Sequence, residues 1–74
     1  MTLQDSKAGL VYTITQVNPS PMQTRFTQLG FAKGSEVRVV RRAPIFKYPV
    51  LVRTSVTTVM LSREESALIG VEIV

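Results

Sequence analysis

The 74-residue sequence has no cysteine, no histidine and no tryptophan. Without cysteine the chain can form no disulfide and offers no thiolate nucleophile, which fits a reducing compartment. Without histidine it lacks the commonest general base and, with the missing thiolates, the side chains that bind transition metals best. We therefore expect no catalytic residue, no resident cofactor and no tight iron or zinc site.

Acidic residues are few, and they are scattered along the chain. The five carboxylates are Asp5, Glu36, Glu64, Glu65 and Glu72. Only Glu64 and Glu65 are adjacent, and neighbours in a helix point to different faces. No pair of carboxylates is placed for general acid and base work. The acidic residues therefore strengthen the prediction that the protein is not an enzyme.

Long apolar runs are also missing. The longest is a few residues, whereas a helix that spans a bilayer needs roughly 20. Residues 1–10 lack the apolar core of a signal peptide. We expect a soluble cytoplasmic protein. A chain this short forms one domain, residues 1–74, and buries only about 60% of the surface that its unfolded form exposes.

Alternating and β-branched segments predict a mainly β fold. The expected strands are Val11–Val17, Glu36–Arg42, Pro49–Arg53, Val56–Leu61 and Val71–Val74. In the second of these, Val37 and Val39 should face inward and Arg38 outward, while Val40 breaks the alternation and indicates a bulge. Such a bend is typical of a small barrel.

Two helical segments are predicted from capping signals. Ser20 precedes a proline and is followed three residues later by Gln23, a capping-box pattern that opens a helix running to about Leu29. Gly30 should end that helix, so that Phe31 packs back on Phe26. Residues 62–65 repeat the capping-box pattern and open a helical turn through residue 69.

These elements together favour a small, partly open antiparallel barrel. It has about five strands, one short helix after the first strand and a helical turn before the last. Periodicity alone does not order the strands.

Basic residues gather on or beside the predicted hairpin of residues 36–53, within a net charge of +4. They are Arg38, Arg41, Arg42, Lys47 and Arg53. One interpretation is a solvated strand face that resists aggregation, and the other is a surface for an anionic partner. Phe46 and Tyr48 flank Lys47 at the hairpin tip, where each ring either folds onto the barrel or contacts a partner.

Several of these motifs resemble the ferrous-iron transport protein A (FeoA) family. The resemblance runs from about Leu3 to the C-terminus and is carried by Leu29-Gly30-Phe31, Gly34, Glu36–Val40, Arg42-Ala43-Pro44, Leu61 and Arg63–Ile69. It implies an SH3-like fold. The chain departs from the family at residues 45–49, where a Gly-Asp-Pro turn is common, and near Thr54-Ser55, where a glycine is expected.

The resemblance also implies a function. It predicts an accessory protein of bacterial ferrous-iron uptake that binds the GTPase-linked permease, ferrous-iron transport protein B (FeoB), on its cytoplasmic side. Aromatic and arginine side chains dominate protein interfaces, so the expected partner-binding residues are Arg41, Arg42, Phe46, Lys47 and Tyr48.

Two alternatives stay open at the level of sequence. The basic hairpin could bind nucleic acid with Phe46 and Tyr48 as stacking platforms, although no RNA-binding or zinc motif accompanies it and we expect no nucleic acid. The domain also resembles SH3-like modules of metal-dependent repressors, but it carries no DNA-binding segment. Whether the barrel self-associates is also open.

Overall fold

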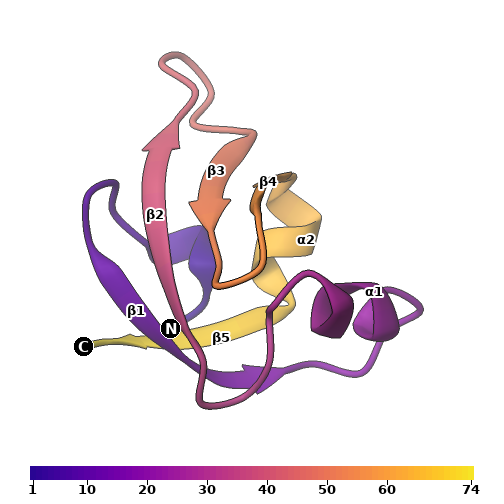
Figure 1. Ribbon diagram of the computed structural model, residues 1–74. Helices are drawn as coiled ribbons and strands as arrows, with labels where there is room; N and C mark the ends of the chain where they lie inside the picture. Colours follow the sequence, from indigo (N-terminus) through magenta and orange to yellow (C-terminus); the bar gives the residue numbers. More distant parts are fainter.

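The computed structural model describes all residues, 1–74. Its main feature is one five-stranded sheet that curves into a barrel (Figure 1). Its five strands are β1 (Val11–Val17), β2 (Glu36–Arg42), β3 (Val50–Arg53), β4 (Thr58–Leu61) and β5 (Ile69–Ile73). They pair antiparallel in the order β4-β3-β2-β1-β5. Because β4 and β5 are not paired with each other, the barrel is partly open, as predicted.

Strand β2 follows its sequence pattern closely. Val37 and Val39 are buried and Arg38 is exposed. The pairing register with β3 shifts between Val39 and Arg41, which leaves Val40 as the predicted bulge. The bulge bends the strand. Its last residues, Arg41 and Arg42, follow the bulge and lie next to the β2–β3 loop.

The first helix, α1 (Gln23–Gln28), begins later than expected. The Ser20 hydroxyl accepts the N–H of Met22 at 3.1 Å, and the cap position is Met22, which makes no side-chain hydrogen bond. The predicted capping box at Ser20 is therefore wrong. The reason is a turn over Pro21 and Met22, in which the Gln23 N–H donates to the Ser20 carbonyl at 3.1 Å.

The end of α1 is as predicted. Gly30 has a φ of +98°, in the left-handed region, and the Phe31 N–H donates to the Phe26 carbonyl at 2.9 Å. The two rings meet edge to face with centroids 5.8 Å apart. Phe26 and Phe31 are both buried, so this turn supplies two aromatic side chains to the core.

The second helix, α2 (Arg63–Ala67), has the complete capping box that the sequence predicts. The Ser62 hydroxyl accepts the Glu65 N–H at 3.2 Å, and the Glu65 carboxylate accepts the Ser62 N–H at 2.9 Å. The helix ends in time for β5 to begin at Ile69, two residues before the predicted start.

The N-terminal segment contributes an element that the sequence did not predict. Residues Leu3–Asp5 form a short 3-10 helix, η1, which contacts α2 and β5. Leu3 is completely buried, and Thr2 forms an isolated bridge with Gly70. The start of the chain therefore completes the core. The core side chains are Leu3, Tyr12, Ile14, Phe26, Phe31, Val37, Val39, Val50, Val52, Leu61, Ile69 and Val71.

Strand β4 is shorter than predicted because residues 54–57 form the turn between β3 and β4. Thr54 organises it: its hydroxyl accepts the N–H groups of Val56 and Thr57, each at 3.1 Å. Residue 56 and Thr57 therefore lie outside β4, which begins at Thr58. Strand β3 begins at Val50, one residue after the predicted start.

Candidate functional site

The β2–β3 loop, residues 43–49, extends beyond the barrel at the top of Figure 1. The Lys47 N–H donates to the Ala43 carbonyl at 3.0 Å, and Lys47 has a φ of +66°. This closed turn leaves Ile45 80% and Phe46 78% exposed. Two adjacent large apolar side chains therefore stand in solvent at the tip of the hairpin.

Arg42 connects this loop to the N-terminal segment. Its Nε donates to the Ser6 carbonyl at 2.9 Å and its Nη2 to the Leu3 carbonyl at 2.6 Å. On the other side, its Nη1 donates to the Lys47 carbonyl at 3.3 Å. Arg42 therefore holds the loop and the N-terminal segment together, and because all of these acceptors are uncharged carbonyls, none of them offsets its charge.

The two aromatic residues of the loop have different environments. The Tyr48 ring is half-buried, and its centroid lies 5.2 Å from Arg42 Cζ and 4.9 Å from Arg63 Cζ, within cation–π range of both. Tyr48 therefore folds onto the barrel, and Phe46 is the exposed ring. The sequence had left both outcomes open for each ring.

A groove of about 720 Å³ lies between the N-terminal segment and the β2–β3 loop. All five of the predicted partner-binding residues line it, so the structure brings them together. We call it the basic groove. Its lining residues are Gln4, Asp5, Ser6, Lys7, Ala8, Arg41, Arg42, Ala43, Pro44, Phe46, Lys47, Tyr48 and Arg63.

The structure adds Lys7 and Arg63 to this site and separates Arg38 and Arg53 from it. Lys7 follows η1 and Arg63 opens α2, so no local pattern connects either residue to the hairpin. Arg38 and Arg53 are exposed cross-strand partners on β2 and β3, outside the groove lining. The predicted basic cluster is therefore divided between the groove and the neighbouring outer face of β2 and β3.

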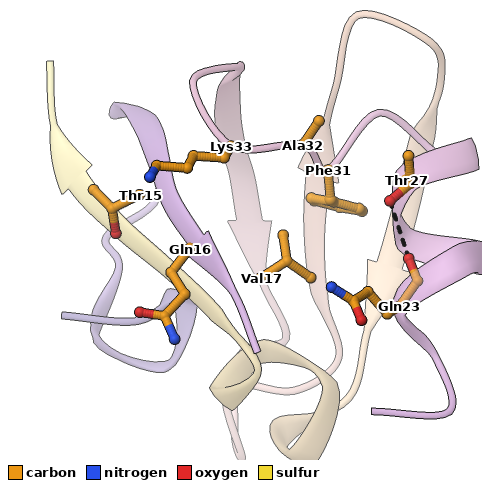
Figure 2. A pocket seen from close by; sticks show the side chains of 8 residues that line it. All are labelled: Thr15, Gln16, Val17, Gln23, Thr27, Phe31, Ala32 and Lys33. Atoms are coloured by element: carbon orange, nitrogen blue, oxygen red, sulfur yellow. Dashed lines mark hydrogen bonds between the residues drawn. The ribbon is translucent and has the colours of Figure 1, made fainter. Parts of the chain in front are cut away.

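A second hollow, of about 420 Å³, lies between β1 and α1 (Figure 2). Strand β1 contributes Thr15, Gln16 and Val17, and α1 contributes Gln23 and Thr27, whose hydroxyl donates to the Gln23 carbonyl at 3.1 Å. Lys33 is the single charged residue of the lining. The hollow has neither paired titratable groups nor a cluster of charge.

Two of the five carboxylates accept a backbone N–H close by in the chain. Asp5 accepts the Thr2 N–H at 3.1 Å, in the same way as Glu65 caps α2. No group of three or more His, Cys, Asp or Glu residues is positioned to hold a metal ion. None of the helices has the length and apolar character needed to cross a bilayer.

Comparison with known proteins identifies the family. The FeoA domain matches residues 1–73. Iron(II) transport protein A from Clostridium thermocellum is 27% identical with a TM-score of 0.90, over 100% of this chain and 46% of that one. FeoA from Chlorobium tepidum is 31% identical with a TM-score of 0.88, and the match covers 100% of this chain and 70% of the Chlorobium protein.

A third solved structure gives the fold its name. FeoA from Stenotrophomonas maltophilia, solved with zinc, is 29% identical with a TM-score of 0.85, over 97% of this chain and 89% of that one. It is described as a prokaryotic SH3 domain protein and put forward as a ferrous iron transport activating factor. The SH3-like fold is thus confirmed. No curated protein matches the sequence.

The chain spans less than half the length of the Clostridium protein that it matches. The family match nevertheless covers almost every residue of this chain. It includes the α1 turn at Gly30, the bulged strand β2 and the capped helix α2, the features on which the resemblance rested. The chain belongs to the FeoA family, which is connected with ferrous iron transport.

Proposed function

We propose that this protein is a small cytoplasmic accessory protein of bacterial ferrous-iron uptake that binds the FeoB permease. The observation that carries the proposal is the exposure of Ile45 and Phe46 at the tip of the β2–β3 loop. An apolar pair held in solvent beside arginine side chains is typical of a protein interface. Family membership supports the connection to iron uptake.

Binding, rather than catalysis, suits the chemistry of the basic groove. Its lining contains cations, amides, one tyrosine and a single carboxylate, Asp5, which already accepts a backbone N–H. Arg42 is held by hydrogen bonds to uncharged groups, so no carboxylate offsets its attraction for an anion. Such a surface can recognise a partner and position it.

The first test is co-purification of the permease with the tagged protein. We expect the double variant Ile45→Ser, Phe46→Ser to retain at most about a tenth of the wild-type affinity, because losing about 1.4 kcal/mol at an interface anchor weakens binding tenfold. The matched control is Ile73→Ser, Val74→Ser, since those side chains are 59% and 68% exposed at the end of β5, away from the loop. The control should bind like the wild type.

Two results would contradict the proposal. If the wild-type protein fails to associate with the permease in every nucleotide state, the proposed partner is wrong. If both double variants bind as the wild type does, the contact surface is not the loop tip. Circular dichroism spectra of the variants should match the wild type, because all four replaced side chains are largely exposed.

A further inference from the structure

We propose that the basic groove binds an acidic segment of the partner protein, a stretch of chain that carries several Asp or Glu carboxylates next to an apolar side chain. The carboxylates would lie among the groove cations, and the apolar side chain would contact Phe46. This inference rests on the proposed function for the premise that the partner is a protein.

The charge of the groove carries the first step. It is lined by five cationic residues, Lys7, Arg41, Arg42, Lys47 and Arg63, and by one carboxylate, that of Asp5. The groove therefore has an excess of four positive charges, as large as the net charge of the whole chain, +4. Concentrating the net charge of a protein in one concave surface attracts a ligand of opposite sign.

The floor of the groove is already assembled. Arg42 is held by the Leu3 and Ser6 carbonyls, and Gln4 Nε2 donates to the Arg63 carbonyl at 3.1 Å. The Tyr48 ring lies within cation–π range of both arginines. The Nε, Nη1 and Nη2 of Arg42 already donate to the chain itself, so Arg42 would attract a ligand by its charge, whereas the Arg63 guanidinium, placed against the Tyr48 ring, could donate to a carboxylate.

The rim of the groove is different in character. Lys7, Arg41 and Lys47 are exposed, and Phe46 stands beside them at 78% exposure. Exposed cations around a projecting ring suit a segment in which acidic residues flank an apolar one. The positioned floor would define where the segment lies, and the rim would add attraction over a longer range.

The same geometry favours a protein segment over nucleic acid. Binding of a single strand depends on several aromatic faces that stack successive bases. Here the Tyr48 ring is engaged by Arg42 and Arg63, which leaves Phe46 as the exposed ring of the loop. Its neighbour is the aliphatic Ile45, which offers no stacking face but extends an apolar contact.

The experiment is a titration of the full chain into a fluorescein-labelled peptide of Asp and Glu residues with one central Phe, followed by fluorescence anisotropy. A peptide in which Asn and Gln replace the acids is the neutral control. We expect the acidic peptide to bind and the neutral one to bind at least about tenfold more weakly, since charged pairs dominate recognition in such a groove.

Matched charge reversals locate the binding. The variant Lys7→Glu, Arg41→Glu changes two exposed groove residues, and Arg25→Glu, Lys33→Glu makes the same change in net charge at two exposed residues in and just after α1, outside the groove lining. We expect the first to weaken peptide binding at least about tenfold and the second by less than about threefold, because screening confines exposed charges to a short range. Equal weakening by both would overturn the inference.

Two further arms separate this inference from the proposed function. If the permease binds Lys7→Glu, Arg41→Glu as it binds the wild type, the groove inference is wrong while the proposed function stands. If the acidic peptide binds in the groove but the permease does not bind at all, the proposed function fails and the groove chemistry stands. Tighter binding of single-stranded oligothymidylate than of the acidic peptide, lost in the groove variant, would also overturn the inference.

Discussion

At the scale of single residues, Thr54 holds together parts of the chain that are distant in sequence. Its hydroxyl donates to the Leu29 carbonyl at 2.6 Å, which connects the end of α1 to the β3–β4 turn. Thr54 is buried, and Gly30 packs directly against it. The left-handed turn that ends α1 and the turn that ends β3 therefore depend on each other.

This contact makes a prediction for Gly30→Ala. The new Cβ would lie 2.7 Å from Thr54 Oγ1 and 2.9 Å from Thr54 Cβ, so the buried threonine would have to move. The positive φ adds a conformational cost of about 1–2 kcal/mol. Adding overpacking, we expect a loss of about 2–4 kcal/mol in the free energy of unfolding, measured by denaturant titration.

The control is Gly9→Ala. Gly9 also has a positive φ, +89°, but nothing lies within 4 Å of the added Cβ. It should therefore show the conformational cost alone. Equal losses at Gly9 and Gly30 would mean that Thr54 yields without penalty, against the packing argument.

At the scale of elements, the two helices show how little of their stability is intrinsic. Both are far shorter than the roughly 12–15 residues that an isolated helix needs in water. Helix α1 is anchored by the burial of Phe26, and α2 by the Ser62 capping box and the buried Ser66. The Ser66 hydroxyl also donates to the Ser62 carbonyl at 2.8 Å, which reinforces the first turn.

For this reason, Ser62→Ala should destabilise the protein by about 1 kcal/mol, the usual cost of removing a side-chain cap. The Glu65 N–H would lose its acceptor at the start of α2. The thermal unfolding midpoint measures the effect. Ser55→Ala, in the exposed β3–β4 turn, is the matched control and should change the midpoint little; comparable shifts would show that the cap contributes nothing.

At the scale of the whole molecule, a single core joins both ends of the barrel. The buried side chains run without interruption from Leu3, in the N-terminal segment, to Val71 in β5. The η1 helix, α2 and β5 contact one another on the open side of the sheet. No element has a core of its own, so none should unfold separately.

We accordingly expect one cooperative unfolding transition. In a urea titration followed by NMR, the signals of Tyr48, near the hairpin tip, and Phe31, near α1, should disappear with the same midpoint. Ile14→Val should lower the free energy of unfolding by about 0.5–1.5 kcal/mol, and it should shift both urea midpoints down together. The exposed Ile73→Val is the control. Earlier loss of Tyr48 would show that the hairpin end is a separate unit.

Much of the barrel could be read from local pattern. The residues of β1 and β2 alternate or are β-branched, so both strands have the predicted bounds. The bulge at Val40 and the cap at Ser62 were also visible, because each depends on neighbours a few residues away. The predicted cap at Ser20 failed because the same residue types also form a turn.

Only part of the candidate site could be predicted from the sequence. Its hairpin residues lie close together in sequence, and all five line one groove. The roles of Arg42 and Tyr48 could not be predicted, since composition does not say that one arginine ties down the N-terminal segment while the ring beside it packs on the barrel. Lys7 and Arg63 were missed for the same reason.

The bounds of β1 and β2, the capped turn at Ser62 and the excess of positive charge could be predicted from the sequence, because each follows from composition or from residues within one turn of each other. The family followed from motifs spread along most of the chain. Where that positive charge gathers depends on contacts that form only in the folded chain. Arg42 donates hydrogen bonds to Ser6, which lies 36 positions earlier in the chain, and to Leu3, which lies 39 positions earlier. Contacts over such distances depend on how the sheet closes, and no local pattern records them.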